Sequence, residues 1–285
     1  MSQTHTARRG LRLPGRRIVL YVALAVVVLW TVVPVAWMAI SSLKNPADVL
    51  SRTPLLDFSP TMANYAGLFS GGNSLLTYVR SSVLAAGIST ILATVLGSLA
   101  GYGLARSRWR GKRHLAFWII STRMVPIAAV ILPLYIGFTY LHLINSIWAL
   151  VVAYLSFNLP FAIWIMNAFF ADLPQGIEEA ARVDGANRFQ TFYRIAVPLT
   201  KPGIVTTAIL CLVFAWNDYA FAVTFSGPGS ATLPVAASQL ITQTGVNWGQ
   251  LTAIGTVVAL PMVVIGLAVR KYLVRGLTLG AVTGE

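Results

Sequence analysis

Residues 171–198 read ADLPQGIEEAARVDGANRFQTFYRIAVP, and this polar stretch stands between two long apolar runs at residues 146–170 and 204–225. Each apolar run is long enough to cross a hydrocarbon layer of about 30 Å as a helix, which takes about 20 residues. The stretch between them is far longer than a turn between two helices requires, and long ordered connections commonly carry function. The sequence therefore predicts two membrane spans joined by a structured connection.

Further apolar runs lie on both sides of this pair, so the predicted fold class is an all-α integral membrane protein with six transmembrane helices. The composition agrees with this class. With 56% hydrophobic residues, 10% charged residues and a mean hydropathy of +0.73, the chain has more apolar mass than one water-soluble globule can bury. The expected spans are residues 18–43, 78–105, 115–140, 146–170, 204–225 and 251–269.

The basic residues predict the orientation of these spans. The chain has 21 Lys and Arg against 8 Asp and Glu, a net charge of +13, and the cations cluster before the first span, between the second and third, and after the last. By the positive-inside rule these segments face the cytoplasm, as does the connection at 171–202, whereas the uncharged residues 227–250 face outward. We expect cytoplasmic tails at 1–17 and 276–285 on either side of a transmembrane domain at 18–275.

The charged and reactive residues argue against several classes of function. The cations lie beside span ends rather than on one soluble face, so they predict orientation and no nucleic-acid partner. The single Cys211 excludes a disulfide within the chain, and the three histidines lack the spacing of a zinc site. The sequence also has no G-x-x-x-x-G-K-[ST] phosphate loop. We therefore predict no catalytic, cofactor-binding or metal-binding residue.

One face of the second span carries a small residue at every fourth position. These residues are Ser89, Ala93, Gly97, Gly101 and Ala105. Residues four apart share one face of a helix, and small side chains let helix backbones approach closely inside membranes. This face is predicted to pack against another helix.

The polar connection reads as two short helices. The first is predicted to begin near Pro174, which suits an opening turn, and to end at Gly185, a residue that favours the position after a helix. Glu178 and Arg182 are four residues apart and can pair on its surface. The second helix is predicted to start at Asn187 with a capping box.

The first helix has a shallow face that a partner could approach. Ile177, Ala180, Ala181 and Asp184 recur at helical spacing, with two alanines where larger side chains could stand. Helices of this length are marginal alone in water, so the connection is expected to dock on something. A protein partner and the lipid boundary are both open alternatives.

The order of residues in the connection resembles the EAA loop of the membrane subunits of ATP-binding-cassette importers. The matching residues are Glu179-Ala-Ala181, Gly185 and Ile195-Ala-Val-Pro198, with Val197 in place of the usual leucine. In that family the loop is a coupling helix seated in a cleft of a cytoplasmic ATPase. The resemblance implies ATPase-coupling roles for Glu178, Glu179, Ala180, Ala181, Arg182, Asp184, Gly185, Ile195 and Pro198.

Other segments look like the shorter permease subunit of maltose-type carbohydrate importers. They are NYAGLF at 64–69, RMVP at 123–126, WND at 216–218, TLPV at 232–235 and GLTLGAVTG at 276–284, where Thr283 replaces a frequent lysine. This resemblance implies a non-catalytic permease subunit in a bacterial inner membrane, half of a path for a sugar or oligosaccharide. It also implies partners: a second, homologous permease, two ATPases that bind ATP and Mg²⁺, and an extracytoplasmic solute-binding protein, all acting within membrane lipid.

Several polar and aromatic residues are candidates for the substrate path. Arg123 lies about nine residues into the third span, about 13 Å deep at 1.5 Å per residue, where a charge has to face protein or a water-filled cavity. A mixture of hydrogen-bonding and stacking groups near the outer end of the fifth span suits a sugar, although it could equally form an interfacial belt. The candidates are Arg123, Tyr154, Asn158, Trp164, Trp216, Asn217 and Asp218.

Two other functions stay open. A permease of the same architecture could carry a non-sugar solute, such as a glycerol-linked phosphate, and would differ only in the residues of its path. An ion-coupled carrier or an intramembrane enzyme would need buried acids, a nucleophile with its base, or inverted-repeat broken helices, which Asp218 alone does not supply.

Overall fold

The computed structural model describes residues 14–50, 58–69, 74–243 and 245–279. Most of the two predicted cytoplasmic tails lies outside the described residues. The described chain is almost entirely helical, and its one small sheet pairs β1 (Ile241–Thr242) with β2 (Gly245–Val246) in antiparallel register. The helices are α1 (Pro14–Ser42), α2 (Ala63–Phe69), α3 (Leu75–Arg106), α4 (Lys112–Ser121), η1 (Thr122–Met124), α5 (Ile127–Tyr140), α6 (Ile147–Ala171), α7 (Gln175–Val183), α8 (Arg188–Thr191), η2 (Phe192–Ala196), α9 (Val197–Leu199), α10 (Lys201–Trp216), α11 (Ala220–Phe225), α12 (Leu233–Gln239) and α13 (Trp248–Leu279).

Four of the described helices are long and apolar enough to cross a membrane unbroken. They lie in α1, α3, α6 and the first part of α13. Two further spans are possible only if a bent pair of helices counts as one. These pairs are 112–124 with 127–140, bent by 91°, and 188–199 with 201–216, bent by 77°. The described residues therefore hold four to six candidate spans.

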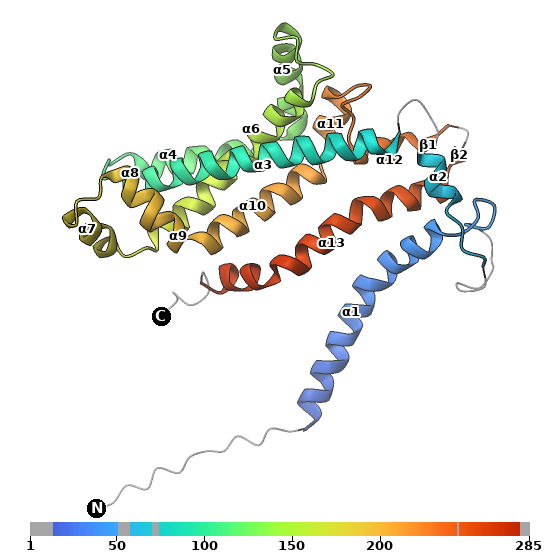
Figure 1. Cartoon of the computed structure of the whole chain (residues 1–285), viewed down its shortest axis with the longest axis horizontal. Helices are drawn as coiled ribbons and strands as arrows, with labels where there is room; N and C mark the ends of the chain where they lie inside the picture. The colour runs from blue at the N-terminus through green and yellow to red at the C-terminus, as the bar shows by residue number, and fades with distance from the viewer. Residues whose placement is uncertain (1–13, 51–57, 70–73, 244, 280–285) are drawn as a thin grey trace, which may run out of the picture.

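The prediction of one continuous helix at 115–140 is wrong. The chain turns sharply at Pro126, and α5 leaves almost perpendicular to α4 (Figure 1). Proline has no N–H to continue the helical ladder and disfavours helical geometry in the residue before it. Val125 is accordingly extended, with φ −66° and ψ 128°.

The predicted span at 204–225 is likewise broken. α10 ends at Trp216 and α11 begins at Ala220. The Oδ1 atom of Asp218 accepts hydrogen bonds from the backbone N–H groups of Phe221 at 3.1 Å and Ala222 at 3.2 Å. A short acidic side chain in this position satisfies the free donors at a helix start, so Asp218 begins a new helix.

The small-residue face of α3 packs against α6, as predicted. Ser89, Ala93, Gly97 and Gly101 are buried. The helices lie so close that a Cβ atom added to Gly97 would stand 2.5 Å from the Cβ atom of Ala162. This contact forms the centre of the bundle.

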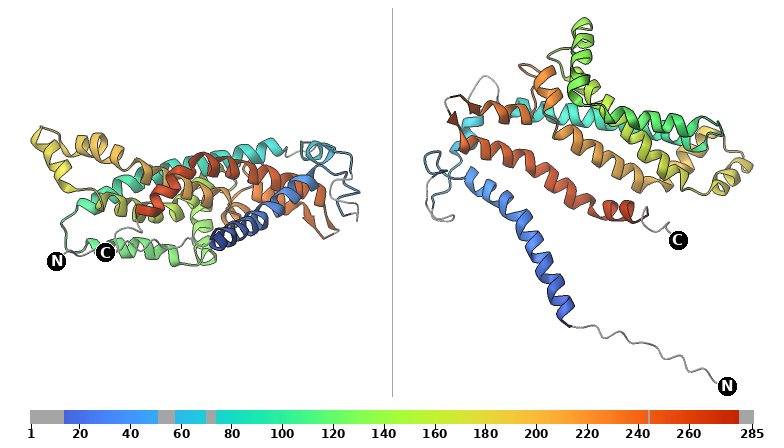
Figure 2. Two further views of the ribbon diagram at one scale, coloured as in Figure 1. Left: turned by 90° about the horizontal axis from the view of Figure 1, so that it is seen from below. Right: turned by 180° about the vertical axis from the view of Figure 1, so that it is seen from behind.

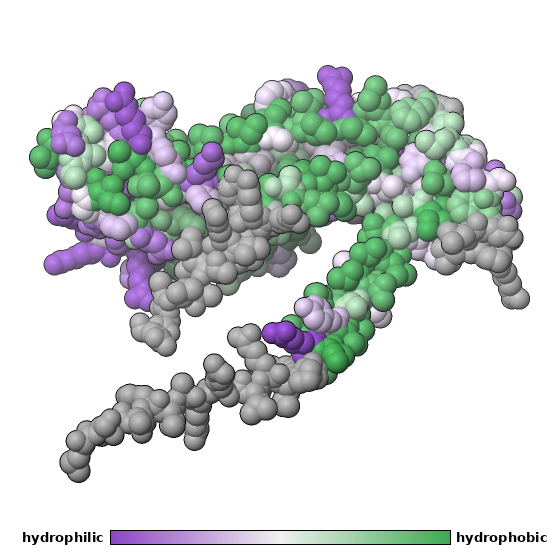
Figure 3. Space-filling view, turned by 60° about the horizontal axis from the view of Figure 1, so that its bottom comes forward, coloured by the Kyte–Doolittle hydropathy of each residue, from purple (hydrophilic) through white to green (hydrophobic). Residues whose placement is uncertain are grey.

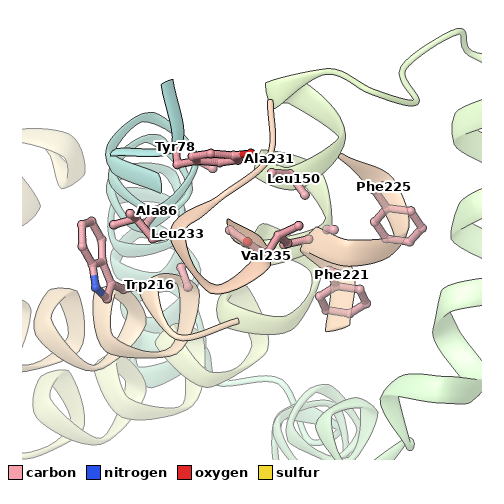
Figure 4. Packing of buried hydrophobic residues seen from close by; sticks show 14 of the residues in the cluster. Tyr78, Ala86, Leu150, Trp216, Phe221, Phe225, Ala231, Leu233 and Val235 are labelled. Carbon is pink, nitrogen blue, oxygen red and sulfur yellow. The ribbon is translucent and has the colours of Figure 1, made fainter. Parts of the chain in front are cut away.

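A second core lies at the end of the bundle opposite α7, where the short helices α11 and α12 pack on the long ones; we call it the outer core, and this end the outer end, after the predicted orientation. Figure 4 shows side chains of this cluster packed together. The labelled members are Tyr78 and Ala86 of α3, Leu150 of α6, Trp216 of α10, Phe221 and Phe225 of α11, Ala231 in the loop before α12, and Leu233 and Val235 of α12. This packing fixes the positions of α11 and α12 relative to α3.

The first helix stands apart. α1 touches α13 at its outer end and then slants away from the bundle (Figures 1 and 2), and none of its most apolar window is buried. Figure 3 shows hydrophobic residues covering the visible side of α1 and much of the long helices, while hydrophilic residues gather at the end that carries α7. A helix that is apolar on its outer faces suits a lipid environment.

Candidate functional site

The connection between α6 and α10 projects from one end of the bundle (Figures 1 and 2). α7 starts directly after Pro174, as predicted, and its end is a Schellman motif. The N–H of Ala186 donates to the carbonyl of Ala181 at 2.9 Å, and the N–H of Gly185 donates to that of Arg182 at 3.1 Å. Gly185 has φ +91°, a conformation that glycine adopts without a steric penalty.

The second predicted helix is present from Arg188 to Leu199, with a π-helical turn in its middle. Its capping box is present, because Asn187 Oδ1 accepts from the N–H of Gln190 at 2.8 Å and Gln190 Oε1 accepts from the N–H of Asn187 at 2.9 Å. α8 lasts one turn, passes through the π-helical turn η2 and ends as α9. Ile195 is half-buried in η2 and Pro198 is exposed in α9.

One side of α7 is open and partly apolar. Ile177 is 46% exposed, and Ala180 and Asp184 of the predicted shallow face are also exposed. Ala181 is half-buried and turns partly toward the bundle. Val183 is 87% exposed and was not among the residues predicted for the open side of this helix. A branched apolar side chain near the end of a short polar helix was the signal that could have identified it.

The predicted pairing of Glu178 with Arg182 is wrong. The Glu178 carboxylate faces the bundle, where its Oε1 accepts from Arg106 Nη2 at 2.6 Å and from Arg106 Nε at 2.9 Å, while its Oε2 accepts from the Tyr102 hydroxyl at 2.9 Å. Arg182 instead donates from Nε to the backbone carbonyl of Glu178 at 3.3 Å. Glu178 thus joins α7 to the end of α3 and takes no part in the open face.

A wide cavity of about 1000 Å³ lies between the end of α3 and the helices α7 and α8. Its described walls carry more positive than negative groups, as expected for a surface on the cytoplasmic side. The charged lining residues are Arg106, Arg108, Lys112, Glu178, Glu179, Arg182 and Arg188.

A second cavity, of about 470 Å³, lies beside the break between α10 and α11. Four predicted path residues line it: Tyr154, Asn158, Asn217 and Asp218. Asn158 is 1% exposed and donates from Nδ2 to the carbonyl of Cys211 at 3.0 Å. The Asn158 Oδ1 atom is buried and has no hydrogen-bond partner among the described residues, while the buried Tyr154 hydroxyl lies beside the Asp218 carboxylate. Unpaired buried polar atoms are costly, so Asn158 Oδ1 is available to a polar ligand, and the neighbouring Tyr154 and Asp218 are further polar groups at the same place.

The other three path candidates lie elsewhere. Trp216 packs in the outer core and donates its indole N–H to the carbonyl of Val258 at 3.1 Å. Trp164 is exposed on α6 and does not line the cavity. Arg123 does not line the cavity; it is half-buried and its guanidinium lies against three aromatic rings.

Three phenylalanines form a cage around Arg123. The central carbon of its guanidinium lies 4.4 Å from the ring centre of Phe157, 4.2 Å from that of Phe161 and 4.3 Å from that of Phe214. Guanidinium groups stack favourably on aromatic faces. Because Phe157 and Phe214 also line the cavity, Arg123 contacts two of the side chains that form its walls.

Comparison with known proteins identifies the family to which this chain is related. The family described as "Binding-protein-dependent transport system inner membrane component" matches residues 93–279. The trehalose transport system permease protein SugB of Mycobacterium tuberculosis is 35% identical over 90% of this chain and 94% of its own length. The trehalose/maltose transport system permease protein MalG of Thermococcus litoralis is 29% identical over 95% and 98%.

A solved structure shows the same fold. A chain of the bacterial ABC transporter involved in the import of the acidic polysaccharide alginate superposes with a TM-score of 0.75 at 23% identity, over 94% of this chain and 99% of that one. Members of the matched family are permease subunits, the non-catalytic membrane components of their transporters. The chain belongs to this family of inner membrane components of binding-protein-dependent ATP-binding-cassette transporters.

Proposed function

We propose that this permease forms half of the translocation path of a bacterial importer for a neutral sugar or oligosaccharide. Related permeases named for trehalose, maltose and diacetylchitobiose support a sugar. The observation that carries the proposal is the cavity at the α10–α11 break, where buried hydrogen-bonding groups stand beside aromatic rings. Such a mixture suits a polyhydroxylated ring, whose hydroxyls need partners and whose faces stack on aromatic surfaces.

The charge of this cavity argues against an anionic solute. Among the described residues that line it, the charged one is Asp218, and the nearby Arg123 is held within its cage. An anion such as a glycerol-linked phosphate would meet a carboxylate in surroundings of low dielectric constant. The proposed contacts to the sugar are therefore Tyr154, Asn158, Asn217 and Asp218.

The proposed partners follow from the projecting α7. Its open face, with Ile177 and Val183, would seat in one of two cytoplasmic ATPases, which would bind ATP and Mg²⁺. A second, homologous permease would complete the path and cover the exposed side of α1. An extracytoplasmic solute-binding protein would deliver the sugar at the outer end, and the whole complex would lie in the bacterial inner membrane.

Reconstitution tests this function. The chain is co-expressed with its second permease and ATPase, placed in liposomes, and supplied with the cognate solute-binding protein and labelled trehalose, maltose or diacetylchitobiose. We expect uptake that requires both ATP and the binding protein. Uptake of none of these sugars, with uptake of a phosphorylated or acidic solute instead, would contradict the proposal.

A separate co-purification experiment tests whether α7 docks on the ATPase. Val183→Asp places a charge on the open face and is expected to lower co-purification of the ATPase, since apolar contacts at the centre of an interface dominate its affinity. Arg110→Asp adds a carboxylate to an exposed cytoplasmic loop and serves as the matched control. Equal ATPase recovery with both variants would make α7 a helix at the lipid boundary.

A further inference from the structure

The ion pair between Arg106 and Glu178 joins the coupling connection to the bundle, and it is the one ion pair found among the described side chains. Its side chains are 16% and 6% exposed, and both guanidinium contacts reach the same carboxylate oxygen, at 2.6 Å and 2.9 Å. Charged groups held in low-dielectric surroundings attract more strongly than exposed pairs. The two residues therefore form a firm link between the last turn of α3 and the first turn of α7.

Tyr102 strengthens this link and extends it to two more helices. Its hydroxyl donates to Glu178 Oε2 at 2.9 Å, one helical turn before Arg106. Its ring packs edge-on to Phe170 of α6, with centres 5.3 Å apart, and against Phe192 of η2, with centres 4.9 Å apart. We call Tyr102, Arg106 and Glu178 the inner clamp.

The opposite end of α3 is bonded to the outer segment. The hydroxyl of Ser82 accepts from the N–H of Leu233, the first residue of α12, at 2.9 Å. The hydroxyl of Tyr78 donates to Gln239 Oε1, at the end of α12, at 3.0 Å. We call Tyr78 and Ser82 the outer clamp. The two clamps are separated by the length of one helix, which Figure 1 shows running from beside α8 to beside α12.

α3 is also the helix best suited to carry a displacement between these ends. It runs for 32 residues without a proline, whereas α1, α5, α6 and α13 contain Pro34, Pro133, Pro160 and Pro261. Proline removes a backbone hydrogen bond and is the commonest cause of a helix kink. The two bent pairs cannot transmit an axial movement across breaks of 91° and 77°. From Tyr78 to Arg106, α3 spans about 42 Å at 1.5 Å per residue.

We propose that α3 is a rigid rod that couples α7 to the outer segment at α12, with the inner and outer clamps as its two attachments. The proposal rests on the proposed function, in which α7 docks on the ATPase and the outer end meets the solute-binding protein. Movement of α7 during ATP binding then displaces α12, and docking of a loaded binding protein at the same end of the bundle acts back on the ATPase through α12. Such coupling between two sites is reciprocal. The clamp residues are positioning residues, since none of them lines the cavity at the α10–α11 break.

The test measures ATP hydrolysis in reconstituted complexes with and without the solute-binding protein, together with sugar uptake per ATP hydrolysed. Arg106→Gln and Tyr102→Phe loosen the inner clamp, and Ser82→Ala loosens the outer one. We expect basal hydrolysis and ATPase co-purification to stay near those of the unmodified complex. Stimulation by the binding protein and uptake per ATP are expected to fall about fivefold or more, the lower end of ordinary coupling between sites. Arg110→Gln, which removes an exposed charge from the loop between α3 and α4, is the control.

The design separates this inference from the function on which it rests. Stimulation of ATP hydrolysis by the binding protein in the unmodified complex tests the proposed function. The stimulation in each variant, divided by that of the unmodified complex, tests whether α3 couples its two ends. Exchange of the charges in Arg106→Glu with Glu178→Arg is expected to restore part of the stimulation. If Arg106→Gln does not assemble, the milder Tyr102→Phe still tests the inner clamp, because it keeps the ring packing and removes only the hydroxyl. Unchanged stimulation in Tyr102→Phe and Ser82→Ala would overturn the proposal. So would a fall in basal hydrolysis that matches a fall in the amount of ATPase that co-purifies, because the variants would then only weaken assembly.

Discussion

A Cβ atom added to Gly101 of α3 would stand 2.9 Å from the Cβ atom of Met166 of α6, closer than side chains pack. The same atom would lie 2.8 Å from the backbone nitrogen of Asn167, which cannot move aside as a flexible side chain can. The approach of α3 to α6 at this level therefore depends on the missing side chain.

Gly101→Ala is expected to destabilise the bundle by about 1–3 kcal/mol, the usual cost of overpacking a close contact. Gly103→Ala is the matched control, because nothing lies within 4 Å of a Cβ atom at that position, two residues along the same helix. Thermal unfolding of the detergent-solubilised protein measures the difference. Equal melting temperatures for the two variants would mean that the helices separate easily here.

Arg123→Ala is expected to reduce sugar uptake while the complex still assembles. Without the guanidinium, Phe157 and Phe214 lose the group that holds them as cavity walls. Arg123→Lys should rescue poorly, because a compact ammonium cannot stack on three rings as a planar guanidinium does. Uptake kinetics and size-exclusion profiles are compared with those of Arg110→Ala, which removes an exposed cation. Normal uptake in Arg123→Ala would make the cage a packing feature only.

Substitutions at Asp218 separate its two roles. Asp218→Asn keeps an oxygen that can accept from the N–H groups of Phe221 and Ala222, so α11 is expected to remain folded while the charge of the cavity is lost. Asp218→Ala loses both the cap, worth about 1 kcal/mol, and the charge. If Asp218 contacts the sugar, Asp218→Asn is already enough to raise the KM for uptake, although it keeps the cap. Wild-type uptake in Asp218→Asn and a defect only in Asp218→Ala would reduce the residue to a helix cap.

Gly185→Val is expected to impair uptake through backbone strain alone. The glycine has φ +91° and open space around it, so the added side chain meets no neighbour. A β-branched residue is strongly disfavoured at positive φ, at a cost of about 1–3 kcal/mol, whereas asparagine tolerates it better. Gly185→Asn should therefore keep most of the uptake. The measurement is uptake with co-purification of the ATPase, and equal results for Val and Asn would show that the turn after α7 is not needed.

Cysteine labelling can test the orientation of the spans. Arg110→Cys is expected to react with a membrane-impermeant thiol reagent only from the cytoplasm, and Gln243→Cys only from outside, because cations precede and follow the spans on the inner side. The native Cys211 is fully buried and gives little background. Labelling of both positions from one side would contradict the predicted topology.

The local features of the connection could be predicted from sequence because each is decided within a few residues. The start of α7 after Pro174, its left-handed end at Gly185 and the capping box at Asn187 all have specific residue requirements, and all are present. The small-residue face of α3 was equally readable, because its spacing matches the helical repeat.

The partner of Glu178 could not be predicted in this way. Arg182, four residues away, satisfies the local rule, but the side chain reaches Arg106, 72 residues earlier in the chain. The choice depends on where the end of α3 lies, and helix packing decides that. The break at Pro126 raises the same difficulty, because Pro34, Pro133, Pro160 and Pro261 lie within continuous helices. A proline alone does not reveal whether a membrane helix bends or stops.

The isolation of α1 from the bundle has a consequence for biosynthesis. A helix surrounded by lipid satisfies its backbone hydrogen bonds internally, and α1 buries none of its most apolar window against the other described helices. α1 can therefore settle in the bilayer before the segments that follow it in the chain have been made. Mutations in α1 are expected to change how much of the chain reaches the membrane and in which orientation, while the molecules that insert correctly fold the rest of the bundle normally.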